Sequence, residues 1–416
     1  MKRLTDANYD IIGYPRLVRL NPNIPWKTRG NGAISLQVGE GKGPKIKIGE
    51  IDDVDIFCYR EDSSDGLKSD NIWEIVEQTV NEQARLDDDN TNSGFVLLRD
   101  QPPFENYKKA VREIINLDDI KIFLDSSDAY YRVYKNSRGL IGATASVAWS
   151  PERDKTYEFI AYRESRRWGS KRSVNDNSTK QMDKIYSSTF DNYDYKNEHN
   201  RLVPNSPCPI LYGIRGENQN DLLEAKSIIK SEKVDSWLIF ETNHGTDDHL
   251  QRKKIVDIIP YDSVIVESVV SKNPHTIPGG HVIFSIKDST GIIDCAAFEP
   301  TKEFRQVIRQ LVTGDKIVVY GGVREKPLTV NLEKIEIKNL EKNIEKVENP
   351  ICPRCSKHMK SKGTGQVFKC IKCRTKSNKP VLKEKKRVIQ VGFYEVPVCA
   401  RRHLSKPLKR MNHKPF

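Results

Sequence analysis

The chain has 416 residues and a formal net charge of +12, so it is long enough for several hydrophobic cores and we expect three or four domains. No apolar run approaches the ~20 residues of a membrane-spanning helix, and the first residues lack the apolar core of a signal peptide. The eight cysteines are too unevenly placed for a disulfide framework. These features exclude a membrane protein and a secreted disulfide scaffold, and they predict a cytoplasmic protein.

The positive charge is concentrated near the carboxyl end. Residues 352–416 contain 19 lysines and arginines against two acids, whereas the preceding part contains 50 against 55. A cationic end of this kind predicts a polyanionic partner. Nucleic acid is favoured over a membrane surface, because no amphipathic face of Trp, Phe and Leu accompanies the cations.

Residues 13–33, GYPRLVRLNPNIPWKTRGNGA, combine four cations, three prolines and three glycines with no acid. Proline fixes φ and glycine accepts positive φ, so this composition is typical of a rigid phosphate-binding loop. The alternative is a surface loop with scattered charge. The phosphate interpretation predicts that a phosphate group is bound by Arg16, Arg19, Lys27, Arg29, Gly30 and Gly32.

The rest of the first 150 residues predicts helices near 72–85 and 107–116 and a strand that begins at Tyr130. The GLIGA run at 139–143 has the glycine spacing of a strand-to-helix turn close to a phosphate. This spacing adds Gly139 and Gly142 to the predicted phosphate site. Ordinary packing glycines are the alternative.

Two further domains follow from the order of the predicted elements. Residues 155–242 alternate strand, helix, strand, helix and strand, which is a split βαβ, ferredoxin-like arrangement if one more strand precedes Cys208. Residues 264–337 give three strands, a helix at 301–311 and two strands. That order is typical of an oligonucleotide-binding (OB) barrel.

Two CxxC pairs, separated by 14 residues, predict a structural zinc site with the ligands Cys352, Cys355, Cys370 and Cys373. A redox dithiol is the weaker alternative, because a redox pair needs no second copy. A complete set of four thiolates leaves no coordination position for His358. Cations on this ribbon and on the basic tail predict contacts with RNA phosphates, although a solvated charge run is the alternative. The predicted contacts are Lys357, Lys372, Arg401, Arg402, Lys406, Lys409 and Arg410.

Two acidic pairs, Asp87 with Asp88 and Asp247 with Asp248, are candidates for binding Mg²⁺ or a cationic substrate. Hard metal ions and guanidinium groups both prefer carboxylate oxygen. A solvated turn is the alternative for each pair.

The amino-acid sequences of several segments are similar to those of a known family. Besides residues 13–33, these segments are TNSG (91–94), NSPCPILYGIRG (205–216), TNHGTDDHL (242–250), PGGHVIFSI (278–286) and ARRHLSKPLKR (400–410). The chain resembles the archaeal 2-agmatinylcytidine synthetases, which modify the AUA-decoding isoleucine tRNA. The resemblance implies a ligase that uses ATP to join agmatine to carbon 2 of the wobble cytidine, so that a CAU anticodon reads AUA.

The resemblance also implies an α+β multidomain fold and a set of ligands. The cofactors would be ATP, Mg²⁺ and Zn²⁺, and the partners would be isoleucine tRNA and agmatine, with no obligate protein partner. Cations of residues 16–29 would neutralise the ATP phosphates, and a carboxylate would hold the agmatine guanidinium. The expected domains are a kinase-like α/β domain (1–150), a ferredoxin-like domain (151–255), an OB barrel (256–345), a zinc ribbon (346–378) and a basic tail (379–416).

One part of the family pattern has no counterpart in this chain. The family's kinase-like domain opens with an Asp-Asp-Thr-Asp-Ser stretch followed by a phosphate-carrying threonine, and no such stretch occurs here. The kinase-like domain is therefore expected to be incomplete at its amino terminus, and the catalytic residues stay unassigned. We expect this polypeptide to bind tRNA but to transfer little agmatine. The alternative function is a noncatalytic RNA- or single-stranded-DNA-binding protein built on the barrel and the ribbon.

Overall fold

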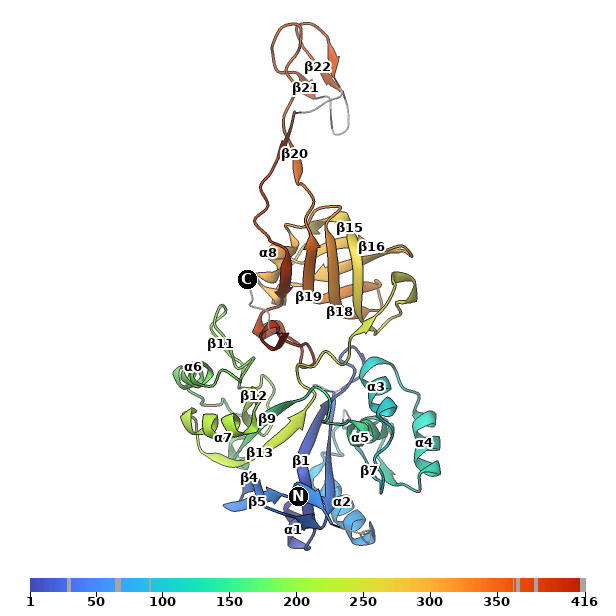
Figure 1. Cartoon of the computed structure of the whole chain (residues 1–416), viewed down its shortest axis with the longest axis vertical. Coiled ribbons are helices and arrows are strands. Elements are labelled where there is room, and N and C mark those ends of the chain that lie inside the picture. Colours follow the sequence, from blue (N-terminus) through green and yellow to red (C-terminus); the bar gives the residue numbers. More distant parts are fainter. Residues whose placement is uncertain are drawn as a thin grey trace.

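The computed structural model describes residues 1–27, 31–63, 69–89, 91–361, 363, 367–377 and 381–411. Two α/β lobes lie side by side at one end of the molecule, a β-barrel lies in the middle, and a small ribbon lies at the far end on a narrow stalk (Figure 1). Among the described residues, no helix is long and apolar enough to cross a membrane.

One mixed sheet runs through both lobes. Its seven strands include a main path of five neighbours and two strands, β4 (Ile46–Ile51) and β5 (Val54–Cys58), that branch from β13. The main path is β12 (Ile210–Gly216), β9 (Thr156–Arg163), β13 (Val234–Thr242), β1 (Asp10–Arg19) and β2 (Gly32–Gly39). β1 is parallel to β13 and antiparallel to β2. The first 150 residues and the following segment are thus joined by backbone hydrogen bonds.

The proline- and glycine-rich segment 13–33 is not one loop, because residues 13–19 belong to β1 and residues 32–33 belong to β2. β1 contains Pro15, and the β1–β2 register shifts between Ile12 and Arg16, as expected where proline removes a backbone donor. Leu17 and Val18 are buried on either side of the sheet. Alternating apolar residues therefore decide the local structure, and only residues 20–31 connect β1 to β2.

The described part of the amino-terminal lobe (residues 1–150) contains five helices (Figure 1). They are α1 (Lys2–Asp6), α2 (Ser69–Gln83), α3 (Phe104–Arg112), α4 (Leu117–Ser126) and α5 (Gly139–Ala148). The helix predicted at 107–116 is α3, which ends already at Arg112. Asn116 instead caps α4, and its side chain accepts a hydrogen bond from the Asp118 amide at 3.1 Å. The apolar α5 packs against α3 and α4 through Leu140, Tyr107 and Leu124.

The second lobe (residues 151–250) contains α6 (Asp176–Ile185) and α7 (Gln219–Ile228) with β9, β12 and β13. The predicted strands and helices are present, but the extra strand expected before Cys208 does not join the sheet. Two short strands, β10 (Tyr193–Asp194) and β11 (His199–Asn200), pair only with each other. The polar run NYDYKNEHN has no apolar alternation for a buried strand, and β1 lies beside β13 instead.

The predicted OB barrel is confirmed. Its strands are β15 (Ser263–Thr276), β16 (Val282–Lys287), β17 (Ile292–Ala297), β18 (Lys316–Arg324) and β19 (Thr329–Asn339). Pairing of β15 with β18 closes the barrel. The helix expected at 301–311 is shorter: a 3₁₀ turn (Glu299–Thr301) precedes α8 (Phe304–Ile308), which buries Phe304 and Ile308 in the barrel core.

A two-stranded stalk, β20 (Ile344–Glu348) and β24 (Val381–Glu384), leads to the ribbon. The chain then returns to the barrel as β25 (Gly392–Glu395), which pairs with β19. It continues into a segment between the barrel and the lobes, residues 401–411, which we name the carboxyl-terminal strap (Figure 1). The ribbon itself contains β21 (Lys360–Ser361), β22 (Phe368–Lys369) and β23 (Lys376–Ser377).

Candidate nucleotide and RNA sites

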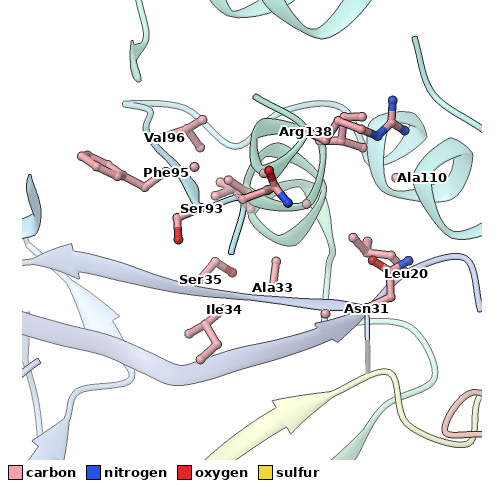
Figure 2. Close-up of a pocket in the computed structure, with 18 of the residues that line it drawn as sticks. Leu20, Asn31, Ala33, Ile34, Ser35, Ser93, Phe95, Val96, Ala110 and Arg138 are labelled. Carbon is pink, nitrogen blue, oxygen red and sulfur yellow. The ribbon is translucent and has the colours of Figure 1, made fainter. Parts of the chain in front are cut away.

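A cavity of about 610 Å³ lies between β2 and the amino-terminal end of α5, and we name it the α5 cavity. Its lining comes mainly from three stretches: residues 31–36, residues 91–97 and residues 136–143. Figure 2 shows Arg138 and Asn31 at one end and Phe95 at the other. One end is therefore polar and cationic, and the other is apolar.

The cationic end suits phosphate. α5 begins at Gly139, and the positive end of its dipole faces the cavity. Asn136 Oδ1 accepts a hydrogen bond from the Arg138 amide at 3.0 Å, which fixes the turn before the helix. The Arg138 guanidinium lies 5.3 Å from the centre of the Trp26 ring. A nucleotide, with an apolar base and an anionic tail, matches this division.

Two glycines lie where the backbone approaches this end of the cavity. A Cβ on Gly139 would lie 2.6 Å from Asn92 O and closer still to Gly94 N. A Cβ on Gly142 would meet only side-chain atoms, Leu20 Cδ1 at 3.2 Å and Ala33 Cβ at 3.4 Å. Gly139 therefore packs closely against another chain segment and also lines the cavity. It is thus a packing glycine and at the same time a candidate for the phosphate site.

The predicted phosphate-binding residues divide into two groups. Lys27, Gly32, Gly139 and Gly142 all line the α5 cavity, whereas Arg16 and Arg19 do not. Residues three apart in a strand point to opposite faces, so these two arginines of β1 cannot converge on one anion. Arg29 and Gly30 lie outside the described residues.

Arg16 and Arg19 have partners within the protein. Arg16 Nη1 donates a hydrogen bond to Trp149 O at 3.1 Å. Arg19 Nη2 lies 3.6 Å from Glu158 Oε2, and burial lowers the pKa of the arginine. The phosphate cradle expected from four converging cations is thus not formed by these two.

A buried cluster around Glu158 was not indicated by any local sequence pattern. The Glu158 carboxylate lies 3.4 Å from Arg215 Nε as well as close to Arg19. The rings of His244 and His403 lie next to these arginines with centroids 5.1 Å apart. Burial and then Arg215 lower the pKa of His244 well below its usual range. Arg19 and then burial lower the pKa of His403 in the same way, so both histidines are neutral at pH 7.

The two acidic pairs lie in different places. Asp87 and Asp88 are exposed in the turn after α2. Asp247 accepts hydrogen bonds from Lys334 Nζ at 2.6 Å and from the Lys406 amide at 2.7 Å. Asp248 accepts one from the Tyr107 hydroxyl at 2.6 Å, and burial raises its pKa. Asp247 and Asp248 thus bind neighbouring parts of the protein, and neither pair lines the α5 cavity.

The five cations predicted for the basic tail belong to the carboxyl-terminal strap, and they too have internal partners. Arg410 Nη2 and Lys406 Nζ each lie 2.7 Å from Asp154. Arg401 pairs with Asp191 and Glu395. The others are Arg402, whose Nη1 lies 3.3 Å from Glu333 Oε1, and Lys409, which donates to Thr189 O. This arrangement differs from the exposed tail that the charge run suggested, because the acids come from segments distant in sequence.

The four predicted zinc ligands lie together. The sulfur atoms of Cys352, Cys355, Cys370 and Cys373 are all within 4.8 Å of one another. This spacing fits a tetrahedral ion with four thiolates, which is a closed structural site. Within the described ranges, this is the one group of three or more metal-ligating side chains, so a carboxylate site for Mg²⁺ is not shown. Lys357 and Lys372 are exposed on the same ribbon.

Removal of zinc is expected to unfold the ribbon without unfolding the lobes. Structural zinc contributes about 10–16 kcal/mol to small ribbons, and the ribbon's own core consists of the cysteines with Met359 and Phe368. A chelator, or Cys370→Ser, should expose residues 349–389 to limited proteolysis and weaken tRNA binding. Cys208→Ser, at a half-buried cysteine outside the ribbon, is the control. A protease-resistant ribbon without zinc would contradict this prediction.

Acid is expected to weaken the junction between barrel and lobes through Glu333. Burial alone would raise the pKa of Glu333, but His249, Arg402 and Lys334 lower it from 4.5 to about 2. The ionised Glu333 therefore contributes fully to the free energy of unfolding above pH 4.5. This contribution, about 3 kcal/mol, is lost as the pH falls towards 2. Denaturant titrations at successive pH values measure the free energy of unfolding. The difference in this free energy between wild type and Glu333→Gln should narrow by this amount as the pH is lowered. A difference independent of pH would contradict the assignment.

The comparisons with known proteins agree with this architecture. Four family models match in sequence order: the TiaS TCKD domain (residues 1–136), the TiaS FLD domain (137–249), an OB-fold nucleic acid binding domain (264–341) and the TiaS C-terminal zinc ribbon domain (349–389). The isoleucine-tRNA 2-agmatinylcytidine synthetase TiaS of Archaeoglobus fulgidus is 43% identical over 420 residues, 99% of this chain and 92% of the relative. That of Methanocaldococcus jannaschii is 41% identical over 408 residues, 96% of this chain and 90% of the relative.

Solved structures of TiaS are also similar. A complex of TiaS with its isoleucine tRNA and ATP has a TM-score of 0.81 at 39% identity, over 98% of this chain and 90% of that one. A complex of TiaS with the same tRNA, AMPCPP and agmatine has a TM-score of 0.81 at 37% identity, over 100% and 92%. The likeness extends through both lobes, the barrel and the ribbon, and the chain belongs to the family of isoleucine-tRNA 2-agmatinylcytidine synthetases.

Proposed function

We propose that this protein is an ATP-dependent ligase that joins agmatine to carbon 2 of the wobble cytidine in the isoleucine tRNA with a CAU anticodon. The observation that carries the proposal is the end-to-end likeness to a complex that holds this isoleucine tRNA, AMPCPP and agmatine. Such an enzyme would work in the cytoplasm, where it meets the tRNA pool.

The chemistry needs an activated oxygen on the base. A carbonyl oxygen leaves poorly, whereas the same oxygen carrying a phosphoryl group from ATP leaves as phosphate. The agmatine amine then forms the new carbon–nitrogen bond at carbon 2 as the carbon–oxygen bond breaks. The target base must leave the anticodon stack to be reached.

The α5 cavity is our candidate for the ATP site. Lys27, Arg138 and the amino-terminal end of α5 surround its polar end, where they would offset the negative charge of the phosphates. Mg²⁺ would accompany the nucleotide, with phosphate oxygens among its ligands. The apolar end at Phe95 would receive the base.

The alternative, a noncatalytic nucleic-acid-binding protein, is not favoured. The barrel and ribbon would be sufficient for that role, yet family models of TiaS also match residues 1–249. Those residues contain the α5 cavity.

Incorporation of labelled agmatine into an unmodified transcript of the isoleucine tRNA, with ATP and Mg²⁺, tests the proposal. We expect incorporation that requires ATP and disappears when the wobble cytidine of the transcript is replaced by uridine. Tight binding of tRNA with no incorporation under any condition would favour the noncatalytic alternative.

A further inference from the structure

A second cavity, of about 360 Å³, lies where the β1–β2 connection meets the barrel and the carboxyl-terminal strap. We name it the junction cavity. Asn23 and Lys27 come from the connection, Tyr261, Arg324 and Lys326 from the barrel domain, and Arg402 from the strap. Three segments far apart in the sequence therefore bring four cations to one place.

The acids near this cavity do not balance its cations. Its one acidic lining residue, Glu325, accepts a hydrogen bond from the Tyr261 hydroxyl at 2.9 Å. Arg402 has a carboxylate partner in Glu333. In the part of the chain that the structure describes, no ion pair joins Lys27, Arg324 or Lys326 to an acid. Burial and then the charge of Arg402 lower the pKa of Lys27, so an anion between these two side chains would offset their repulsion.

The wall of the junction cavity is held in place by hydrogen bonds. Asn23 Nδ2 donates to Asp262 O at 2.7 Å and to Ser263 Oγ at 2.9 Å, and its Oδ1 accepts from Arg402 Nη1 at 2.5 Å. A Cβ on Gly322 would overlap Asn23 Oδ1. Glycine at this position in β18 therefore permits the close approach of the connection to the barrel.

We propose that the junction cavity binds a backbone phosphate of the bound tRNA, an inference that rests on the proposed function. Phosphate contacts by Lys and Arg orient a nucleic acid on its protein. The nearby rings favour an RNA strand: Trp26 is 54% exposed, and its ring lies 6.4 Å from that of Tyr261. Exposed aromatic rings beside cations are typical surfaces for stacking unpaired bases.

Lys27 places the junction cavity next to the α5 cavity, because it lines both of them. A tRNA phosphate held by Arg324 and Lys326 would thus lie next to the proposed ATP site. This geometry would direct the adjoining nucleotide towards the α5 cavity.

The double variant Arg324→Gln/Lys326→Gln tests the inference, because both residues are exposed, Arg324 at the end of β18 and Lys326 in the turn that follows. Its affinity for the unmodified isoleucine tRNA should fall, and the slope of log affinity against log salt should decrease by roughly one for each phosphate that the variant no longer neutralises. ATP affinity measured without tRNA should be unchanged. Lys109→Gln/Lys184→Gln removes two exposed helical cations and is the matched control, for which we expect the wild-type slope.

The outcomes separate the two proposals. If wild type neither binds the tRNA nor transfers agmatine, the proposed function fails. If wild type does both and Arg324→Gln/Lys326→Gln keeps its salt slope, the junction cavity does not bind tRNA phosphate. Loss of ATP affinity with an unchanged slope would instead assign the cavity to the nucleotide, and would also overturn the inference.

Discussion

Gly139→Ala is expected to reduce agmatine transfer on the order of 100-fold, the cost of displacing reacting groups by about 1 Å. The added Cβ would lie 2.6 Å from Asn92 O and closer still to Gly94 N. Both are backbone atoms that cannot rotate away, so the turn at residues 91–94 must move from the amino-terminal end of α5. ATP affinity, measured by titration calorimetry, should fall together with the transfer rate.

Gly142→Ala, one turn further along α5, is the matched control. Its Cβ would meet only side-chain atoms at 3.2 Å or more, so we expect nearly wild-type transfer and ATP affinity. Arg138→Gln leaves the helix backbone unaltered and should weaken ATP binding, which separates loss of the site from loss of the fold. Normal ATP affinity in both Gly139→Ala and Arg138→Gln would show that the α5 cavity is not the nucleotide site.

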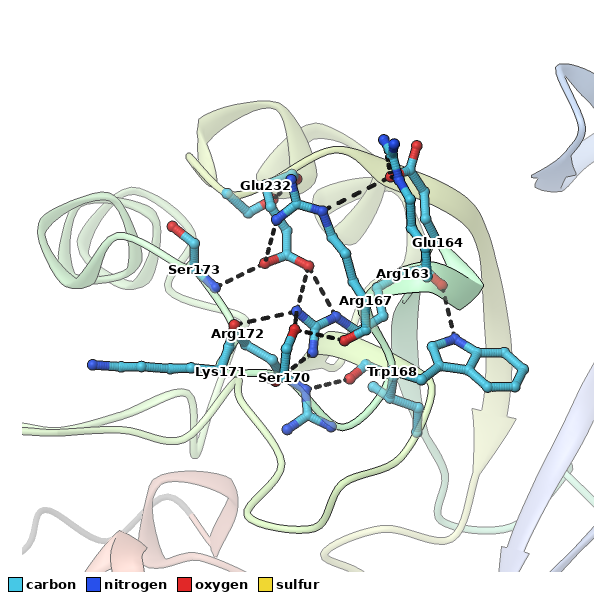
Figure 3. A network of polar contacts seen from close by, with 12 residues as sticks. Arg163, Glu164, Arg167, Trp168, Ser170, Lys171, Arg172, Ser173 and Glu232 are labelled. Atoms are coloured by element: carbon cyan, nitrogen blue, oxygen red, sulfur yellow. Dashed lines mark hydrogen bonds and ion pairs between the residues drawn. The ribbon is translucent and has the colours of Figure 1, made fainter.

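Arg163→Met is expected to destabilise the second lobe by about 3–5 kcal/mol, the usual cost of removing one partner of a buried ion pair. Arg163 Nη2 lies 2.7 Å from Glu232 Oε1, and the two side chains are 0% and 3% exposed. Arg163 also donates to Ser170 O at 2.7 Å, which ties the loop after β9 to the lobe (Figure 3). The variant would leave a charged Glu232 buried without this partner. The unfolding midpoint in denaturant should fall accordingly.

Arg166→Gln is the control for this prediction. Arg166 lies in the same loop and pairs with Glu164, but its side chain is 76% exposed, and such pairs contribute only about 0–1 kcal/mol. We also expect Arg163→Met/Glu232→Leu to recover part of the loss, because it leaves no unpaired charge. A midpoint for Arg163→Met within the range of the control would mean that the pair contributes little to stability.

The sequence was sufficient where function depends on local spacing. Cys352 and Cys373 belong to a pattern whose geometry follows from short turns, and the strand order of the barrel follows from apolar runs and one helix. The family resemblance was carried by whole segments and did not depend on any single contact. These predictions needed no knowledge of which distant residues meet.

The sequence was insufficient where a residue's role depends on its partner. Arg401 and Arg410 belong to a charge run that is typical of an exposed tail, but Asp191 and Asp154 bind them from more than 200 residues away. The prolines and glycines of segment 13–33 suggested a loop, whereas residues 13–19, which include the buried Leu17 and Val18, are part of β1. The role of Gly139 also depends on a distant partner. Its closest neighbour is Gly94, and no local sequence pattern indicates that contact.

The sheet that runs through both lobes determines which parts of the molecule can be loosened separately. β1 and β13 are hydrogen-bonded neighbours, so the two lobes share one backbone ladder. Their connection to the barrel also includes side-chain ion pairs such as Lys334 with Asp247 and Arg402 with Glu333. Substitutions that remove these ion pairs would therefore loosen the barrel from the lobes and leave the shared sheet intact.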